Sequence, residues 1–207
     1  LAVVQVATTA VLVSWDAGTN SAGTNFEVQS SSDNVTFGSA GTTSAAVFSV
    51  ASLEAGGTYY VRVRAVNGDG AATAFSNTVS TRTPLAVPTA PGAPSVVLVT
   101  TADVKWEWAA STGATSYRIV LATQTASVLS APATNGITLT GYAPNSLSSV
   151  AVQGVNVDGV GPLSVGAAVY TLAAAPSTLT FVSVGSGTAS LVWDGAGNVP
   201  GTLFRAQ

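Results

Sequence analysis

Two short stretches carry oxygen-bearing side chains at a spacing that could hold a cation. They are residues 67–70 and 156–159, with the sequences NGDG and NVDG. Oxygen ligands at alternate positions are typical of calcium-binding loops. Each stretch supplies only two such side chains, however, and Asn, Asp and Gly are also the residues that tight turns require. We therefore interpret both stretches as turns and predict that the chain has no metal site.

Three carboxylates stand beside tryptophans and could suggest a glycosidase: Asp16, Glu107 and Asp194. Two carboxylates alone can hydrolyse a glycoside. The chain has no Cys and, by the same count, no His, which excludes thiol chemistry, disulfides, zinc centres and the commonest general base. The three carboxylates belong to separate repeats, so we expect solvated strand or turn residues. We predict that the chain is not an enzyme and has no catalytic or cofactor-binding residues.

Charged residues make up 7% of the chain, and the formal net charge is −3. The basic residues are spread without a cluster, whereas nucleic-acid binding draws on clustered Lys and Arg, so we expect no nucleic-acid partner. Glu27 is expected on a strand next to the one carrying Arg62 and Arg64, which predicts a cross-strand ion pair. Asn34 begins the sequon NVT in a predicted hairpin at residues 31–37; in a bacterial protein we expect it to carry no sugar.

The elements that must position these residues repeat along the chain. Three segments begin with Val and end with Trp nine residues later: 6–15, 99–108 and 184–193. Apolar residues alternate towards each Trp, as Val11 and Val13 do before Trp15, and a period of two with one apolar face predicts a half-buried strand. A short strand precedes each segment, and an aromatic residue opens the strand that follows. These aromatic residues are Phe26, Tyr117 and Phe204.

A second pair of segments fixes the length of the repeat. Residues 53–70 and 142–159 are similar, and their Asn-x-Asp-Gly endings lie about 90 residues apart. Repeats of this length, made of predicted strands without helical periodicity, predict an all-β tandem of immunoglobulin-like sandwiches. We expect two complete seven-stranded sandwiches with Trp15 and Trp108 buried between their sheets, and a partial third.

The repeats of this sequence resemble the fibronectin type III domain. The resemblance rests on the Trp of the second strand, the aromatic residue of the third, and the pattern L-x-x-G-x-x-Y-x-V-x-V-x-A-x-N from Leu53 through Tyr59 to Asn67. It covers nearly the whole chain. It implies the fold but little about function, because this fold hosts many unrelated roles. The integrin-binding Arg-Gly-Asp that some relatives carry in this loop is absent from the chain.

The second repeat departs from the family pattern. Ser148 stands where the first repeat has Tyr59, and Tyr142 stands where it has Leu53. The tyrosine corner, in which the hydroxyl bonds nearby backbone, is therefore absent at its usual place. We interpret Tyr142 as a replacement of core volume from the other side, with Trp106 adding a second large ring.

We predict domains at residues 1–83 and 94–172, joined by a proline-rich linker at 84–93. A second linker at 173–178 leads to the first strands of a third repeat at 179–207. The density of proline favours extended, semi-rigid spacing. Two explanations of the partial repeat remain open: the native chain continues, or a neighbouring molecule donates the missing strands. We expect continuation, since residue 1 already begins a full first strand and leaves no strand to donate.

Two function classes remain. The first is a structural or adhesive repeat protein in a self-associating surface assembly or filament; the second is a spacer or accessory module of a secreted polysaccharide-degrading enzyme. The few charges favour the first, because soluble surfaces carry roughly 25–35% charged residues and sheet edges are usually protected by them. We expect a secreted or cell-surface protein, bacterial in source, that binds copies of itself; other surface proteins or glycans stay open. No apolar run reaches the roughly 18 residues of a membrane span.

Overall fold

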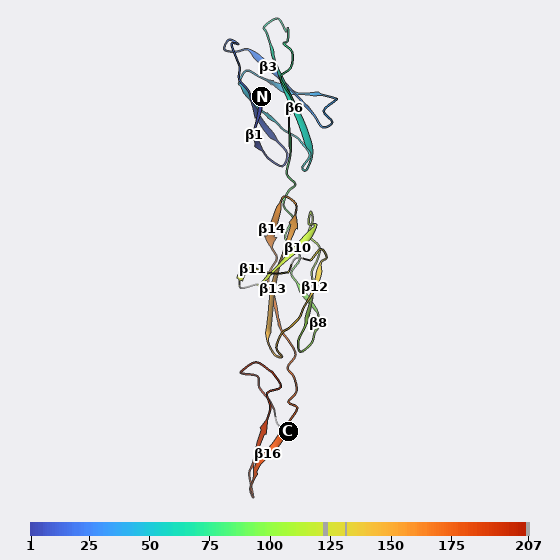
Figure 1. The fold of residues 1–207 in the computed structure, drawn as a ribbon, viewed down its shortest axis with the longest axis vertical. Coiled ribbons are helices and arrows are strands. Elements are labelled where there is room, and N and C mark those ends of the chain that lie inside the picture. Colours follow the sequence, from blue (N-terminus) through green and yellow to red (C-terminus); the bar gives the residue numbers. More distant parts are fainter. Residues whose placement is uncertain (122–123, 131, 206–207) are drawn as a thin grey trace. The chain divides into compact units, whose positions relative to one another are not determined.

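The computed structural model describes residues 1–121, 124–130 and 132–205. Within these residues every regular element is a β-strand, and the strands form antiparallel sheets (Figure 1). The chain divides into two compact units, Leu1–Ala86 and Val87–Gln207. No helix in the described part is long and apolar enough to cross a membrane. The predicted all-β tandem of sandwiches is confirmed.

The first unit contains a three-stranded and a four-stranded sheet. The smaller sheet has the order β1 (Ala2–Val6), β2 (Val11–Ser14), β5 (Val47–Val50). The larger sheet has the order β4 (Gly38–Thr43), β3 (Asn25–Ser31), β6 (Thr58–Val66), β7 (Val79–Arg82). The core is built from alternate residues of these strands, which turn their valines and Phe26 inward. The alternation of apolar residues in the sequence therefore predicted the core residues of this unit correctly.

Two hydroxyl groups, of the half-buried Tyr59 and the buried Thr83, close one end of the first sandwich. Tyr59 accepts a hydrogen bond of 2.7 Å at its hydroxyl from the backbone nitrogen of Glu54. Thr83, which is fully buried, donates to the carbonyl of Glu54 at 2.7 Å and accepts from the nitrogen of Gly57 at 3.1 Å. Together these bonds fix the segment between β5 and β6 against the end of β7. The tyrosine corner that the family resemblance implied is present in this unit.

The second sandwich occupies most of the second unit. One sheet has the order β12 (Gly136–Leu139), β9 (Val104–Glu107), β8 (Ser95–Val99). The other has the order β11 (Gln124–Ser130), β10 (Ser116–Leu121), β13 (Leu147–Asn156), β14 (Gly159–Leu163), and β15 (Ala167–Tyr170) also pairs with β13. The position of the predicted seventh strand is thus shared by two short strands, β14 and β15, on the same neighbour.

The two tryptophans differ in burial. Trp108 is buried at 4% exposure, as predicted, whereas Trp15 is only half-buried and packs at the margin of its core. Each stands just beyond the end of its strand and meets an aromatic ring edge-on at 5.4 Å, Phe26 for Trp15 and Tyr117 for Trp108. The prediction of full burial was therefore right for Trp108 and wrong for Trp15.

A chain of three polar groups replaces the tyrosine corner in the second sandwich. Trp106 donates from Nε1 to the hydroxyl of Ser148 at 3.3 Å, and Ser148 donates to the hydroxyl of Tyr142 at 2.9 Å. Trp106 and Ser148 are each 1% exposed, and Tyr142 packs half-buried against the same core. The structure supports the interpretation of Tyr142 as a volume replacement, because its ring faces the core rather than solvent.

The proline-rich segment packs onto the second sandwich. Pro88, Pro91 and Pro94 are buried, and Thr89 donates from its nitrogen to the carbonyl of Thr112 at 3.1 Å. A Cβ atom on Gly161 would lie 2.2 Å from the carbonyl oxygen of Pro88, so the two backbones touch. From residue 87 onward this stretch therefore belongs to the second unit, whereas a semi-rigid linker is predicted over residues 84–93.

The third repeat contributes a hairpin of β16 (Leu179–Val184) and β17 (Ala189–Trp193). Trp193 meets Phe204 edge-on at 6.1 Å, which repeats the ring pair of the two sandwiches. Asn198 exchanges two hydrogen bonds with the backbone of Ala174, at 2.9 and 2.8 Å. The second linker is therefore bonded to this repeat. The domain boundaries themselves stay a prediction.

Candidate interaction surfaces

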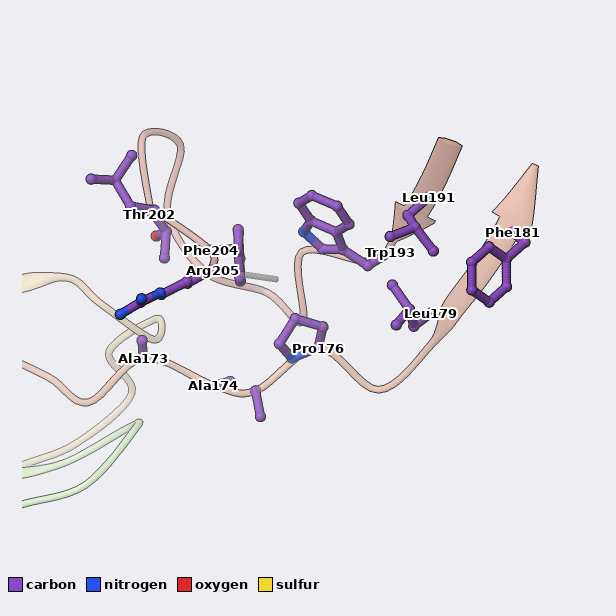
Figure 2. Close-up of a pocket in the computed structure, with 12 residues that line it drawn as sticks. Ala173, Ala174, Pro176, Leu179, Phe181, Leu191, Trp193, Thr202, Phe204 and Arg205 are labelled. Atoms are coloured by element: carbon purple, nitrogen blue, oxygen red, sulfur yellow. The ribbon is translucent and has the colours of Figure 1, made fainter. Parts of the chain in front are cut away.

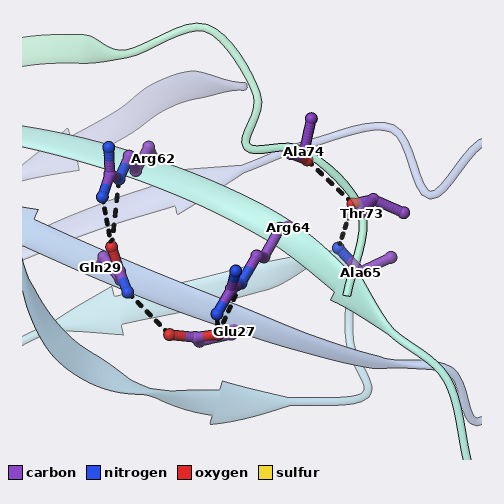
Figure 3. A network of polar contacts seen from close by, with 7 residues as sticks. All are labelled: Glu27, Gln29, Arg62, Arg64, Ala65, Thr73 and Ala74. Carbon is purple, nitrogen blue, oxygen red and sulfur yellow. Dashed lines mark hydrogen bonds and ion pairs between the residues drawn. The ribbon is translucent and has the colours of Figure 1, made fainter. Parts of the chain in front are cut away.

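The outer face of β3 and β6 carries a connected polar network (Figure 3). Arg64 forms an ion pair with Glu27, with its Nη2 2.6 Å from Oε2. Gln29 donates to the other oxygen of Glu27 at 2.8 Å and accepts two bonds from Arg62, at 3.1 and 2.8 Å. The predicted cross-strand pair is confirmed for Arg64, whereas Arg62 bonds a neutral amide. The hydrogen bond from Arg64, more than any other cause, holds the pKa of Glu27 below its ordinary value.

Two phenylalanines stack on the arginines of this network. The guanidinium of Arg62 lies 3.9 Å from the ring centre of Phe37 and 4.0 Å from that of Phe75, and the guanidinium of Arg64 lies 4.5 Å from Phe75. Cation–π contacts of this kind favour Arg over Lys because its planar group stacks. Sequence reasoning missed both rings. The sequence contains one signal that could have identified them. An aromatic residue that lies outside the alternating apolar positions of a strand is available to stack on the two arginines that the strand carries.

Backbone bonds from β6 hold Phe75 in place. Thr73 and Ser76, on either side of Phe75, each bond β6 twice. Ser76 donates from its nitrogen to the carbonyl of Val63 at 2.7 Å, and its hydroxyl accepts from the nitrogen of Val63 at 3.1 Å. Thr73 makes the same pair of bonds with Ala65, at 3.0 and 3.1 Å. The stack therefore depends on the segment that follows the loop at residues 67–70.

The two Asx-Gly loops are turns. The side-chain oxygen of Asn67 accepts from the nitrogens of Asp69 and Ala71 at 3.1 and 2.7 Å. Asn156 uses its oxygen in the same way, on Asp158 and Gly159 at 3.0 and 2.9 Å. The turn interpretation is confirmed, because the amide oxygens serve the backbone. In the described part of the chain no three Asp or Glu residues gather as cation ligands.

The three carboxylates beside tryptophans are each bonded within their own repeat or the linker next to it. Asp16 accepts from the nitrogen of Gly18 at 2.8 Å, and Glu107 pairs with Lys105 at 3.0 Å. Asp194 accepts bonds from Ser177 and Thr178, and the hydroxyl of Ser177 is the main cause that lowers its pKa. These local partners agree with turn and strand roles. The absence of catalysis remains a prediction.

The hairpin at residues 31–37 is ordered by its own side chains. Asp33 accepts from the nitrogens of Val35 and Thr36, both at 2.8 Å, and from the hydroxyl of Ser31 at 2.7 Å. The bond from Ser31 is the largest cause that lowers the pKa of Asp33. Asn34 sits exposed in this turn with a φ of 61°. The sequon therefore lies at the surface, as predicted.

The first strand of every repeat carries a bulge with an exposed valine. Pairing skips one residue between Val3 and Gln5 in β1, and likewise once in β8 and once in β16. The skipped residues are Val4, Val97 and Val182, which are 58%, 51% and 65% exposed. The strands β1 and β8 are edges of their sheets. Sequence reasoning missed these residues because alternation does not reveal where a bulge inserts an extra residue.

The inner face of the third repeat lines a groove (Figure 2). The groove has a volume of about 610 Å³ and lies between the second linker, the hairpin and residues 202–205. Its apolar lining includes Phe181, Leu191 and Trp193. In the first repeat the equivalent residues, Val3, Val13 and Trp15, belong to the core or pack against it. Arg205 is the one charged residue among those that line it.

Comparisons with known proteins find a family model that matches the first sandwich. Residues 1–82 match the family model described as Fibronectin type III domain. The comparison with curated proteins returns no match. Domains of this family are generally non-catalytic, typically extracellular modules of structure or adhesion, arranged in tandem.

Two solved structures from chicken are similar to the chain. The FN1–FN3 domains of chicken CNTN1 are 18% identical over 80% of this chain and 61% of that one, with a TM-score of 0.46. A segment of two fibronectin type III domains from chicken tenascin is 16% identical over 82% of this chain and 97% of that one, with a TM-score of 0.45. The chain spans about three fifths of the CNTN1 structure. The first sandwich thus matches the fibronectin type III family that its sequence resembled.

Proposed function

We propose that this chain is part of a non-catalytic extracellular repeat protein that associates with copies of itself through the first strands of its repeats. The observation that carries the proposal is the exposed bulge valine of each repeat: Val4, Val97 and Val182. A bulge twists an edge strand and normally helps to prevent pairing with other chains. Here the residue at the bulge is apolar, so the edge strand can bind another molecule through this side chain and does not repel it.

The surroundings of these valines contain little charge. The strands β1, β8 and β16 contain no charged residue. In β8 the neighbours of the bulge, Val96 and Leu98, are 39% and 54% exposed. Apolar surface left in water is unfavourable by roughly 25 cal/mol per Å², and burial against another molecule would relieve this cost. Because the same feature recurs in each repeat, a second copy of the chain offers a matching series of contacts.

The alternative is a spacer or accessory module of a secreted polysaccharide-degrading enzyme. The observation that favours it is the closed polar face of the first sandwich, where Arg62 and Arg64 are already bonded and stacked. The side chains of this face are committed to one another, which suits a spacer. In that case the chain would remain monomeric in solution.

Sedimentation of the chain over a range of concentrations separates the two functions. We expect concentration-dependent association, which a variant with Val4→Lys, Val97→Lys and Val182→Lys abolishes or weakens by at least about tenfold, since charges on edge strands oppose pairing. The matched control adds three lysines at exposed turn positions, with Ser32→Lys, Ala133→Lys and Ser186→Lys, and should associate like the parent. A monomeric parent, or equal association of both variants, would contradict the proposal.

A further inference from the structure

The chain contains two Asn-Gly dipeptides, and the loop at residues 156–159 has an Asn-Val in place of the Asn-Gly at 67–70; the structure holds these three sites differently. The dipeptides begin at Asn67 and Asn135, and the Asn-Val begins at Asn156. We propose that Asn67 is a site of spontaneous deamidation in the folded protein, whereas Asn135 and Asn156 are protected. The proposal is independent of self-association.

The reaction requires only water. The backbone nitrogen of Gly68 attacks the side-chain carbonyl carbon of Asn67, and a C–N bond forms while the bond to Nδ2 breaks. The proton of the attacking nitrogen goes to the departing group, which leaves as ammonia. Water then opens the cyclic imide at either of its carbonyls and produces aspartate or isoaspartate. Glycine favours the attack, because without a Cβ its backbone reaches conformations that other residues avoid.

The turn at Asn67 leaves the reacting atoms open. Asp69 and Ala71 donate to Oδ1 at 3.1 and 2.7 Å, and this is the oxygen on which negative charge develops during the attack. Donors that already point at a developing oxyanion stabilise it. Among the described residues, none forms a hydrogen bond with Nδ2 of Asn67 or with the nitrogen of Gly68. Both residues are exposed, and a Cβ on Gly68 would meet no atom within 4 Å.

The second Asn-Gly dipeptide is tied to a neighbouring strand segment. Asn135 donates from Nδ2 to the carbonyl of Trp108 at 2.9 Å, and the nitrogen of Trp108 donates to the carbonyl of Asn135 at 3.1 Å. The leaving group is therefore held in place. Gly136 begins β12 and pairs with Glu107, so its backbone is fixed in the extended conformation. These contacts therefore hinder cyclisation at Asn135, although it also precedes a glycine.

Asn156 repeats the turn but lacks the other conditions. Its side-chain oxygen accepts from two backbone nitrogens, as that of Asn67 does. Asn156 is 6% exposed, however, and Val157 follows it in place of glycine. A β-branched side chain restricts the backbone and crowds the attacking nitrogen. Turn geometry alone therefore does not make a reactive site, and exposure with glycine is required as well.

Deamidation at Asn67 would act on the stacked face of the first sandwich. Aspartate would add one negative charge, and isoaspartate would add a methylene to the backbone path. The longer path would disturb the 2.9 Å bond from the nitrogen of Asn67 to the carbonyl of Ala71 and the adjacent bridge between Val66 and Ala72. These contacts lead directly into the segment that holds Phe75 against Arg62 and Arg64. We therefore expect the isoaspartate form to loosen the stack.

Mass spectrometry after incubation of the folded chain at mildly alkaline pH tests the proposal. Trypsin releases residues 65–82, which contain Asn67 together with Asn77 as a reference in the same peptide. We expect a mass gain of about 1 Da that fragmentation assigns to Asn67, with Asn77, Asn135 and Asn156 unchanged. The variant Gly68→Val, which copies the Asn-Val of the other loop, should react about tenfold more slowly or less.

The reciprocal change and the unfolded chain complete the test. Urea should release Asn135 to react at a rate comparable to Asn67, since the tie to Trp108 is lost. Val157→Gly should leave Asn156 far slower than Asn67 in the folded protein, because Asn156 stays buried. Equal rates for Asn67 and Asn135 in the folded chain, or an unreactive Asn67, would overturn the proposal.

Discussion

Trp106 and Ser148 are joined by a hydrogen bond of 3.3 Å across the core of the second sandwich. We predict that Ser148→Ala destabilises this sandwich by about 1–3 kcal/mol, because it leaves the indole N–H buried without a partner. The matched variant Tyr142→Phe removes only the far end of the same chain and should cost less. Calorimetric unfolding of the two variants measures both effects. An unchanged unfolding temperature for Ser148→Ala would show that the indole does not depend on this partner.

Two threonines occupy the same place in the two sandwiches. Thr171 is 2% exposed; it donates to the carbonyl of Ala143 at 2.8 Å and accepts from the nitrogen of Ser146 at 2.9 Å, as Thr83 does with Glu54 and Gly57. We predict that Thr83→Val and Thr171→Val each cost about 1–3 kcal/mol, since each leaves buried backbone groups without partners. Denaturant unfolding gives the values. Thr81→Val, at a less buried position of β7, is the control and should change stability little.

The different burial of the two tryptophans predicts different costs of truncation. Trp108→Ala should destabilise the second sandwich by about 3–5 kcal/mol, which is typical of a large buried ring. Trp15→Ala should cost less in the first sandwich, because part of that ring is already in water. Calorimetry of both variants compares the transitions. Equal losses would mean that Trp15 is more deeply packed in solution than its exposure indicates.

The Glu27–Arg64 pair predicts a pH dependence. The pKa of Glu27 is lowered from 4.5 in the folded state, so the unfolded chain binds more protons in this range. The stabilisation is complete above the unfolded pKa and is lost as pH falls through the folded one. We expect thermal unfolding temperatures of the first sandwich to fall below pH about 4.5, and Glu27→Gln should reduce this slope. The pKa of Asp33 is also lowered in the folded state, so part of the pH dependence should remain in this variant.

Self-association through the bulge valines should withstand salt. Apolar burial is not weakened by moderate NaCl, whereas exposed ion pairs are screened. Light scattering at low and high NaCl should therefore report the same average mass. Dissociation as salt rises would indicate a charged interface and would direct attention to the Arg62 and Arg64 face.

The regular features of the fold could be predicted from the sequence because they depend on local repetition. The spacing from Trp15 to Phe26 returns in the third repeat as Trp193 to Phe204, and the rings meet in both. Alternation predicted buried valines because a strand turns every second residue inward. The turn at Asn67 could be predicted from residue type, since the side chain bonds its own backbone.

The remaining features depend on contacts between residues distant in sequence. In the sequence, Ser148 stands only for the loss of a tyrosine. In the structure its hydroxyl accepts a hydrogen bond from Trp106, which is 42 positions away. Val97 looks like one more residue of an apolar strand until the pairing of β8 skips it. The stacking of Arg62 requires the positions of Phe37 and Phe75 together. No local pattern contains this information.

The contact between Pro88 and Gly161 defines what a transferable module of this protein must contain. The carbonyl of Pro88 approaches so closely that any side chain at position 161 would collide with it. A gene fragment that began at the first residue of β8 would encode a sandwich with an uncovered face. A fragment that carries the second sandwich intact must therefore include the proline stretch from residue 87 onward.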